Sequence, residues 1–150
     1  MADPLNRVAT AIGAGLLAGA AGTAAMTLSS TLEAKLRGRG ASSAPSDAAG
    51  KVLGVQPRNP AGRARFSTAV HWCYGTAWGA ARGLIGLSGL GERSSTAVHL
   101  GAVWGWSLVM LPALGVAPPA WQQPRQEVAV DLLHHLVYAT GTSAAFRAFE

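Results

Sequence analysis

Long apolar stretches separated by polar connections dominate the hydropathy pattern of the chain. No Asp, Glu, Lys or Arg occurs from Val8 to Thr31 or from Ser94 to Pro124. Each stretch exceeds the roughly 20 residues that an α-helix needs to cross the hydrocarbon core of a bilayer. Two further apolar segments begin after Arg65 and from Glu127. The pattern predicts an all-α integral membrane protein built as a four-helix bundle. The predicted helices cover residues 8–28, 66–85, 95–111 and 127–146.

The one long polar segment covers residues 36–64, between the first and second predicted helices. Gly and Pro residues punctuate it, as is typical of a loop. Within it, Ser46 could cap a short helix at 47–53 that lies against the membrane surface. Shorter Gly-rich or Pro-rich connections separate the other helices. We therefore expect a single membrane domain over residues 1–150.

A cleaved signal peptide is the alternative for the first apolar stretch. Arg7 precedes a short apolar run, and the sequence at 18–20 resembles a small-residue cleavage site. The apolar stretch continues well past that site, which favours a membrane helix.

Basic residues are concentrated in the polar loop. Charged residues form only 13% of the chain, about half the usual share, yet the net charge is +5. Seven of the twelve Lys and Arg residues are Lys35, Arg37, Arg39, Lys51, Arg58, Arg63 and Arg65. A nucleic-acid-binding protein would display such charge on a solvated face, so we expect no nucleic-acid partner. The positive-inside rule instead predicts a cytoplasmic loop and both termini outside, with the lipid bilayer as the main partner.

Two isolated side chains stand out in the second predicted helix. Cys73 is the only cysteine, which excludes an intrachain disulfide, and we expect a packed, inert thiol. Arg82 lies near the end of this helix, where its long side chain could reach the membrane interface.

The fourth predicted helix has a polar face. At 100° per residue, its polar side chains fall within one arc of about 100°. These residues are Glu127, Asp131, His134, His135, Tyr138 and Thr142. The opposite arc is aliphatic, so the polar face is expected to line the bundle interior. Helix rise places His71 at a similar depth and His99 near the opposite surface. The predicted polar cluster therefore comprises His71, Glu127, Asp131, His134, His135 and Tyr138 and leaves out His99.

Three roles are open for this cluster. The polar groups could hold the helices together, at roughly 1 kcal/mol per contact. A His beside an Asp could also handle protons. A metal ion or haem could be bound, and His71, Asp131 and His135 form the predicted metal ligands, although no strict spacing motif is present. Otherwise no cofactor is expected. We expect a non-enzyme, because the sequence contains no phosphate loop, nucleophile elbow or triad spacing.

Glycines recur at four-residue spacing in three of the predicted helices. The pairs are Gly15 and Gly19, Gly75 and Gly79, Gly79 and Gly83, and Gly101 and Gly105. Such spacing allows helix backbones to approach closely. Packing inside one bundle is favoured over contacts in a homo-oligomer, because the pairs occur in several helices.

The segment Leu111 to Pro119 contains a Pro-x-x-Gly-x-x-Pro-Pro turn, and the helix that follows carries Asp131 four residues before His135. In these features the last third of the chain resembles the YagU-like family of uncharacterised bacterial inner-membrane proteins. The resemblance implies a multi-pass location in a bacterial inner membrane and an association with acid resistance. A structural or stress-related accessory protein is therefore expected. The alternative is a small proton or metal transporter that uses the His/Asp cluster.

Overall fold

The computed structural model describes residues 3–40, 42–55 and 57–149, and these residues contain helices but no strand. The elements are α1 (Pro4–Leu36), α2 (Ala44–Leu53), α3 (Pro60–Gly86), α4 (Glu92–Ala113), a short 3-10 helix η1 (Ala120–Gln122) and α5 (Arg125–Phe149). The prediction of an all-α fold is confirmed.

The long helices extend beyond the predicted bounds, and α1 and α3 begin at polar caps rather than at the limits of the apolar stretches. Helix α1 begins at Pro4, where the Asp3 carboxylate accepts a hydrogen bond from the Leu5 backbone at 3.2 Å. Helix α3 begins at Pro60 in the same way, because Asn59 accepts from the Gly62 backbone at 2.7 Å. The short helix in the loop is also longer than predicted. Its N-cap is Ser43, not Ser46.

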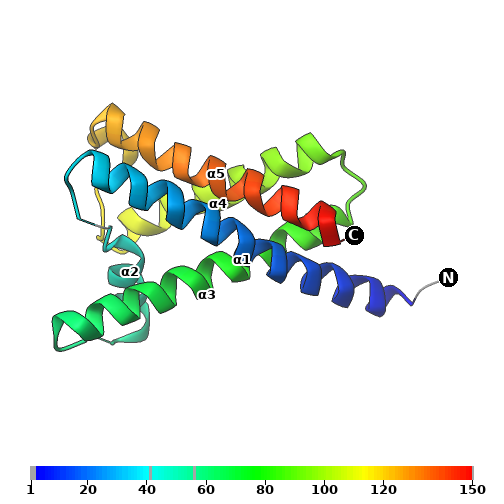
Figure 1. Ribbon diagram of the computed structural model, residues 1–150, viewed down its shortest axis with the longest axis horizontal. Coiled ribbons are helices and arrows are strands. Elements are labelled where there is room, and N and C mark those ends of the chain that lie inside the picture. The colour runs from blue at the N-terminus through cyan, green and yellow to red at the C-terminus, as the bar shows by residue number, and fades with distance from the viewer. Residues whose placement is uncertain (1–2, 41, 56, 150) are drawn as a thin grey trace.

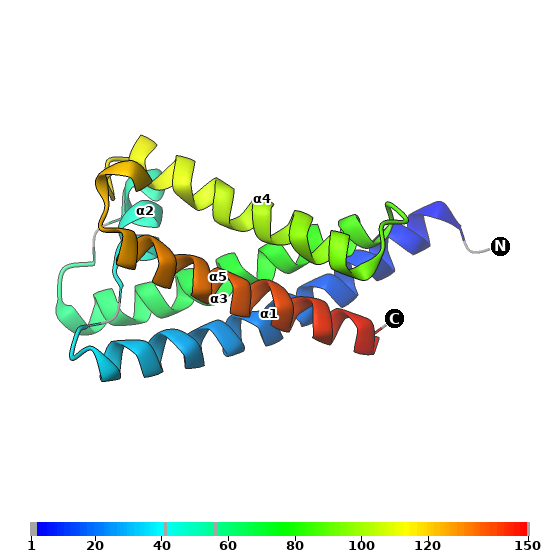
Figure 2. The same cartoon turned by 90° about the horizontal axis from the view of Figure 1, so that it is seen from above.

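The four long helices alternate in direction along the molecule (Figures 1 and 2). Both chain ends therefore lie at one end, together with the turn between α3 and α4, and we call this the terminal end. Helix α2 and the segment 114–124 lie at the other end, which we call the loop end. Helix α1 makes its most extensive contacts with α3 and α5, and α4 packs against α5 and α3. Lys51 of α2 donates to the carbonyls of Leu114 and Gly115 at 2.6 and 3.1 Å, which ties the two loops together.

The backbones of α1 and α3 are in direct contact. A Cβ atom added at Gly19 would lie 2.7 Å from Gly79 Cα, and one added at Gly83 would overlap the Ala11 carbonyl. Side chains would prevent this approach, so glycine is required at these positions. By contrast, an added Cβ at Gly101 of α4 would meet none of the described atoms within 4 Å. The α1 and α3 pairs thus pack within the bundle, whereas the α4 glycines make no such contact.

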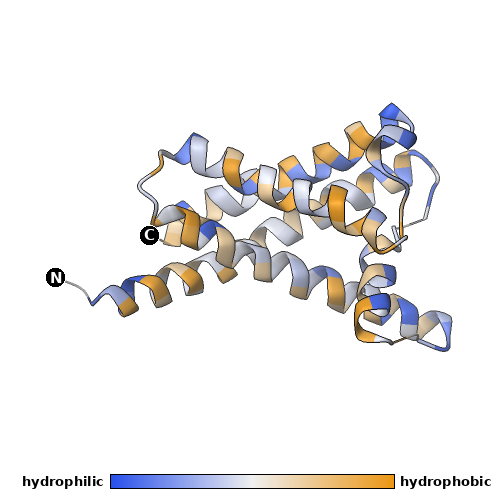
Figure 3. Cartoon of the chain, turned by 180° about the vertical axis from the view of Figure 1, so that it is seen from behind, coloured by the Kyte–Doolittle hydropathy of each residue, from blue (hydrophilic) through white to orange (hydrophobic). Residues whose placement is uncertain are grey.

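Two of the described helices, α1 and α4, are long and apolar enough to cross a membrane by length and composition. Helices α3 and α5 are not in this group, because glycines and polar or aromatic side chains, such as His71 and Arg82 in α3, lower their mean hydropathy. Figure 3 shows hydrophilic residues gathered toward the helix ends, most clearly at the loop end. Four long helices exist as expected, but the structure supports only two of them as apolar spans.

The packed thiol predicted for Cys73 is wrong. Cys73 is exposed on α3, and its neighbours Trp72 and Tyr74 are 38% and 36% exposed. Apolar neighbours in the sequence do not determine which face of the helix a residue occupies. Glycines occupy the face of α3 that packs against α1, and Cys73 lies on an exposed face.

We predict that Gly79→Ala destabilises the protein by about 1–3 kcal/mol, because the new methyl group would be forced into the backbone of α1. The matched control is Gly101→Ala, which should leave stability unchanged or raise it by about 0.5–1 kcal/mol. Unfolding of the purified protein in detergent, followed by circular dichroism, measures both. Equal effects of the two substitutions would contradict the close contact between α1 and α3.

Candidate functional site

Bonded polar side chains, some buried in the bundle and some exposed, form separate groups at the two ends of the molecule. The terminal-end group consists of Arg82, Glu92, Thr96 and Ser143. The loop-end group consists of Ser29, Glu33, Arg37, Arg39, Glu127 and His134. Between them lie His99 and Tyr138.

Arg82 is the centre of the terminal-end group. Its side chain is only 2% exposed, so it does not reach outward to an interface as expected. Its Nε donates to Ser143 Oγ at 2.9 Å, and Nη2 donates to Glu92 Oε2 at 2.8 Å. The guanidinium carbon lies 4.7 Å from the centre of the Phe146 ring. A buried charge requires such partners, and here they join α3 to both α4 and α5. Among the described residues, Nη1 has no hydrogen-bond partner.

Thr96 and Arg147 extend this network. Thr96 donates to Ser143 Oγ at 2.9 Å, and Arg147 Nε lies 3.9 Å from Glu92 Oε1. Glu92 is therefore shared by a buried and an exposed arginine.

His99 and Tyr138 lie side by side in the middle of the bundle. His99 is fully buried, its Nε2 lies 3.1 Å from the Trp78 carbonyl, and its ring centre is 5.6 Å from that of Tyr138. Tyr138 donates to the Gly75 carbonyl at 2.6 Å. The predicted polar cluster left out His99 because of its depth along the helix. In the structure, however, His99 lies next to Tyr138, which is a member of that cluster.

His134 is the buried member of the loop-end group, at 6% exposure. Its Nδ1 lies 2.8 Å from Ser29 Oγ, which ties α5 to α1. Its Nε2 points toward Glu33, 3.7 Å from Oε2, and has no hydrogen-bond partner in the described part of the chain.

Glu33 connects His134 to the surface. Glu33 follows the charge-free stretch that ends at Thr31, and it lies at the loop end of α1. Arg39 Nε and Arg37 Nη1 each donate to its carboxylate at 3.0 Å, and Arg37 also pairs with Glu127 of α5. Hydrogen bonds from Arg39, and then from Arg37, lower the pKa of Glu33 to about 2.

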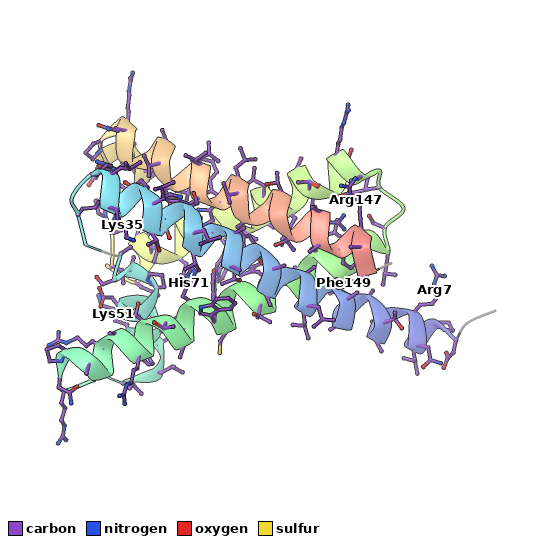
Figure 4. The ribbon with its side chains drawn as sticks, viewed as in Figure 1. Arg7, Lys35, Lys51, His71, Arg147 and Phe149 are labelled. Atoms are coloured by element: carbon purple, nitrogen blue, oxygen red, sulfur yellow. The ribbon has the colours of Figure 1, made fainter. Side chains whose placement is uncertain are left out.

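The predicted metal ligands are not brought together. His71 Nε2 lies 3.0 Å from Thr27 Oγ1 of α1 (Figure 4). Asp131 accepts from Trp104 Nε1 at 2.8 Å, and its Oδ1 lies 3.5 Å from His135 Nδ1. Within the described residues, no three His, Cys, Asp or Glu side chains are placed to hold a metal ion. The set of His71, Asp131 and His135 therefore does not form a metal centre in this structure.

Sequence reasoning missed the partners of these polar groups. These partners lie on α1 and are Thr27, Ser29 and Glu33. Small apolar residues predominate in this helix, so its few polar side chains were not recognised as partners. The Arg82–Glu92 pair had a usable signal. An arginine in an apolar helix needs a counter-charge, and Glu92 is the first acidic residue after it in the chain.

Comparisons with protein-family models, with curated proteins and with solved structures find no match for the chain.

We predict that acid weakens the ion-pair network that Glu33 forms with Arg37 and Arg39 at the loop end. Because the folded pKa of Glu33 lies below its ordinary value of 4.5, this carboxylate stabilises the fold above about pH 4.5. The contribution is lost as the pH falls from there toward about 2. Unfolding midpoints measured in detergent across this range should fall less steeply for Glu33→Gln than for the wild type. Asp47→Asn, on α2, is the control and should retain the steep fall. Parallel curves for Glu33→Gln and the wild type would contradict the prediction.

Proposed function

We propose that the chain is a multi-pass bacterial inner-membrane protein in which α1, α3, α4 and α5 cross the bilayer as a bundle. One observation carries this proposal. Only 11% of the most apolar stretch of α4 is buried. Three of its large side chains are about half exposed or more: Val98 at 47%, Trp106 at 51% and Val109 at 66%. A helix this apolar with so little cover from its own chain is suited to a lipid environment.

The charges of α3 and α5 are compatible with crossing the bilayer. Intramembrane charges normally face the bundle and pair with one another. Arg82 does so with Glu92, and Asp131 accepts from the Trp104 indole. Other charges, including Arg63 and Arg125, lie near the loop end, where a membrane interface would be.

The distribution of basic residues supports a cytoplasmic loop end. Eight of the twelve Lys and Arg residues are Lys35, Arg37, Arg39, Lys51, Arg58, Arg63, Arg65 and Arg125, all toward this end. The remaining four are Arg7, Arg82, Arg93 and Arg147, toward the terminal end. Cytoplasmic ends of membrane proteins carry such an excess.

Within this setting we propose a structural or stress-related accessory role. The interior polar groups mostly bond one another or backbone carbonyls, as expected of groups that hold helices together. The stress-related part of the proposal rests on the resemblance of residues 111–138 to YagU-like proteins.

Proton handling is the second candidate, and His134 favours it. A buried imidazole nitrogen without a partner, 3.7 Å from a carboxylate that reaches the surface, is suited to accept a proton and form an ion pair. The other charged groups around it are Arg37, Arg39 and Glu127, with His135 and Asp131 on its own helix. Metal transport has no comparable arrangement of ligands among the described residues.

We predict that a reporter inserted at Arg39 is cytoplasmic and that one fused to the C-terminus lies outside. The reason is the excess of basic residues at the loop end together with four alternating helices. Paired alkaline phosphatase and fluorescent protein fusions measure each location. A cytoplasmic C-terminus would contradict the topology, and release of the chain from membranes by alkali would contradict membrane insertion.

Flux measurements separate the two candidate functions. In the accessory role, wild-type protein in proteoliposomes passes no protons, and His134→Gln or Asp131→Asn with His135→Gln alters only stability. In the proton-handling role, wild type shows flux that His134→Gln removes while the protein remains folded. Ser67→Ala is the control, because the described hydrogen bonds do not involve this side chain. A pH-sensitive dye inside the vesicles reports the flux, and wild-type flux that survives His134→Gln would remove the reason for the second candidate.

A further inference from the structure

An open cleft of about 410 Å³ lies at the terminal end between α1, α3 and α5. Much of its lining is apolar and includes Phe146 and Phe149 of α5, whereas Asn6, Arg7 and Thr10 of α1 provide polar groups. Figure 4 shows Arg7 and Phe149 at this end of the molecule. The volume falls in the range of about 300–1,000 Å³ that is typical of small-ligand sites.

The cleft follows from the way α1 crosses α3. The helices run antiparallel, and their last close backbone contact joins Ala11 to Gly83. One turn further toward the chain end, Arg7 and Gly86 both line the cleft. Gly86 has no side chain to fill the space. An added Cβ there would lie 3.1 Å from the Phe146 ring.

A cationic group lies directly beneath this lining. The added Cβ at Gly86 would be 3.6 Å from Arg82 Nη1, the guanidinium nitrogen that lacks a hydrogen-bond partner among the described residues. Arg82 is 2% exposed and stacks on Phe146, which also lines the cleft. Its one acidic partner, Glu92, is shared with Arg147. Nη1 therefore has hydrogen-bond donor capacity that the described residues leave unused.

Arg7, which lines the cleft, supplies a second cation. It is exposed and makes no ion pair with any described residue. The nearest acidic residue in sequence, Asp3, caps the first turn of α1. Two arginines beside an apolar cleft are suited to a ligand that is anionic at one end and apolar at the other.

We propose that this cleft binds the phosphate headgroup of an anionic phospholipid. Arg7 binds the phosphate, Arg82 lies behind Gly86 and Phe146 and adds positive charge beneath the wall of the cleft, and the acyl chains lie against Phe149 and the neighbouring apolar surface. A free phosphate would use the arginines but not the apolar walls, which is why a lipid is the better occupant. The inference rests on the proposed membrane location, since the terminal end would then lie at a bilayer interface.

The full-length protein, purified in a neutral detergent and stripped of lipid, provides the test. Phosphatidylglycerol should remain bound in native mass spectrometry and raise the unfolding temperature, whereas phosphatidylcholine and glycerol 3-phosphate should do neither. Arg7→Gln should weaken phosphatidylglycerol binding about tenfold or more, because it removes a charged donor. Gly86→Leu should abolish binding by filling the cleft. Arg93→Gln is the control at the same end, outside the cleft lining, and should bind as the wild type does.

Three results would overturn the inference. Equal stabilisation by phosphatidylglycerol and phosphatidylcholine would show no headgroup selection. Binding of glycerol 3-phosphate as tight as that of the lipid would show a small-anion site instead. Unchanged phosphatidylglycerol binding by folded Arg7→Gln would place the lipid elsewhere. Each of these could occur in a protein with the predicted membrane topology, so the reporter fusions distinguish failure of this inference from failure of the membrane proposal.

Discussion

The backbones of α1 and α3 touch where Gly15 and Gly19 meet Gly79, and the rest of the bundle depends on this contact. Because no side chains intervene, the two axes lie closer together than in ordinary helix packing. This close approach brings the Thr27 hydroxyl to His71, and the opposite side of α1 brings Ser29 to His134. Helix α1 is thus the element around which α3 and α5 are positioned. In lipid, where apolar burial between helices contributes little, such packing supplies much of the association energy.

The long apolar stretches predicted more of the structure than any single motif did. They correctly indicated an all-α chain, because an apolar stretch specifies a helix locally. Which residues meet across the bundle was harder to predict. Rise per residue gives depth along a helix, but the azimuth of each side chain decides its neighbour. His71 and Asp131 have similar predicted depths, but they do not contact each other. His71 lies by Thr27, and Asp131 lies by Trp104. The same limit explains the exposed Cys73.

Buried polar groups at both ends connect α5 to its neighbours by different chemistry. At the terminal end, Ser143 accepts from Arg82 and Thr96, so neutral hydroxyls and a charge share one network. At the loop end, His134 meets Ser29, and Glu127 pairs with Arg37 in an exposed network. Exposed ion pairs add little stability, whereas the buried arginine would be costly without its partners. The terminal end is therefore the more demanding of the two to assemble.

The two apolar helices, α1 and α4, each precede a more polar helix with which they pack. During synthesis at a membrane, α1 would leave the ribosome before α3 exists, and α4 before α5. A helix that must wait in lipid without a partner needs enough hydrophobicity of its own. The polar helix that follows needs less, because a preformed neighbour already offers bonding groups such as Thr27 for His71 and Trp104 for Asp131. For the membrane protein that we propose, this order of hydropathy along the chain would suit entry into the bilayer as two successive hairpins.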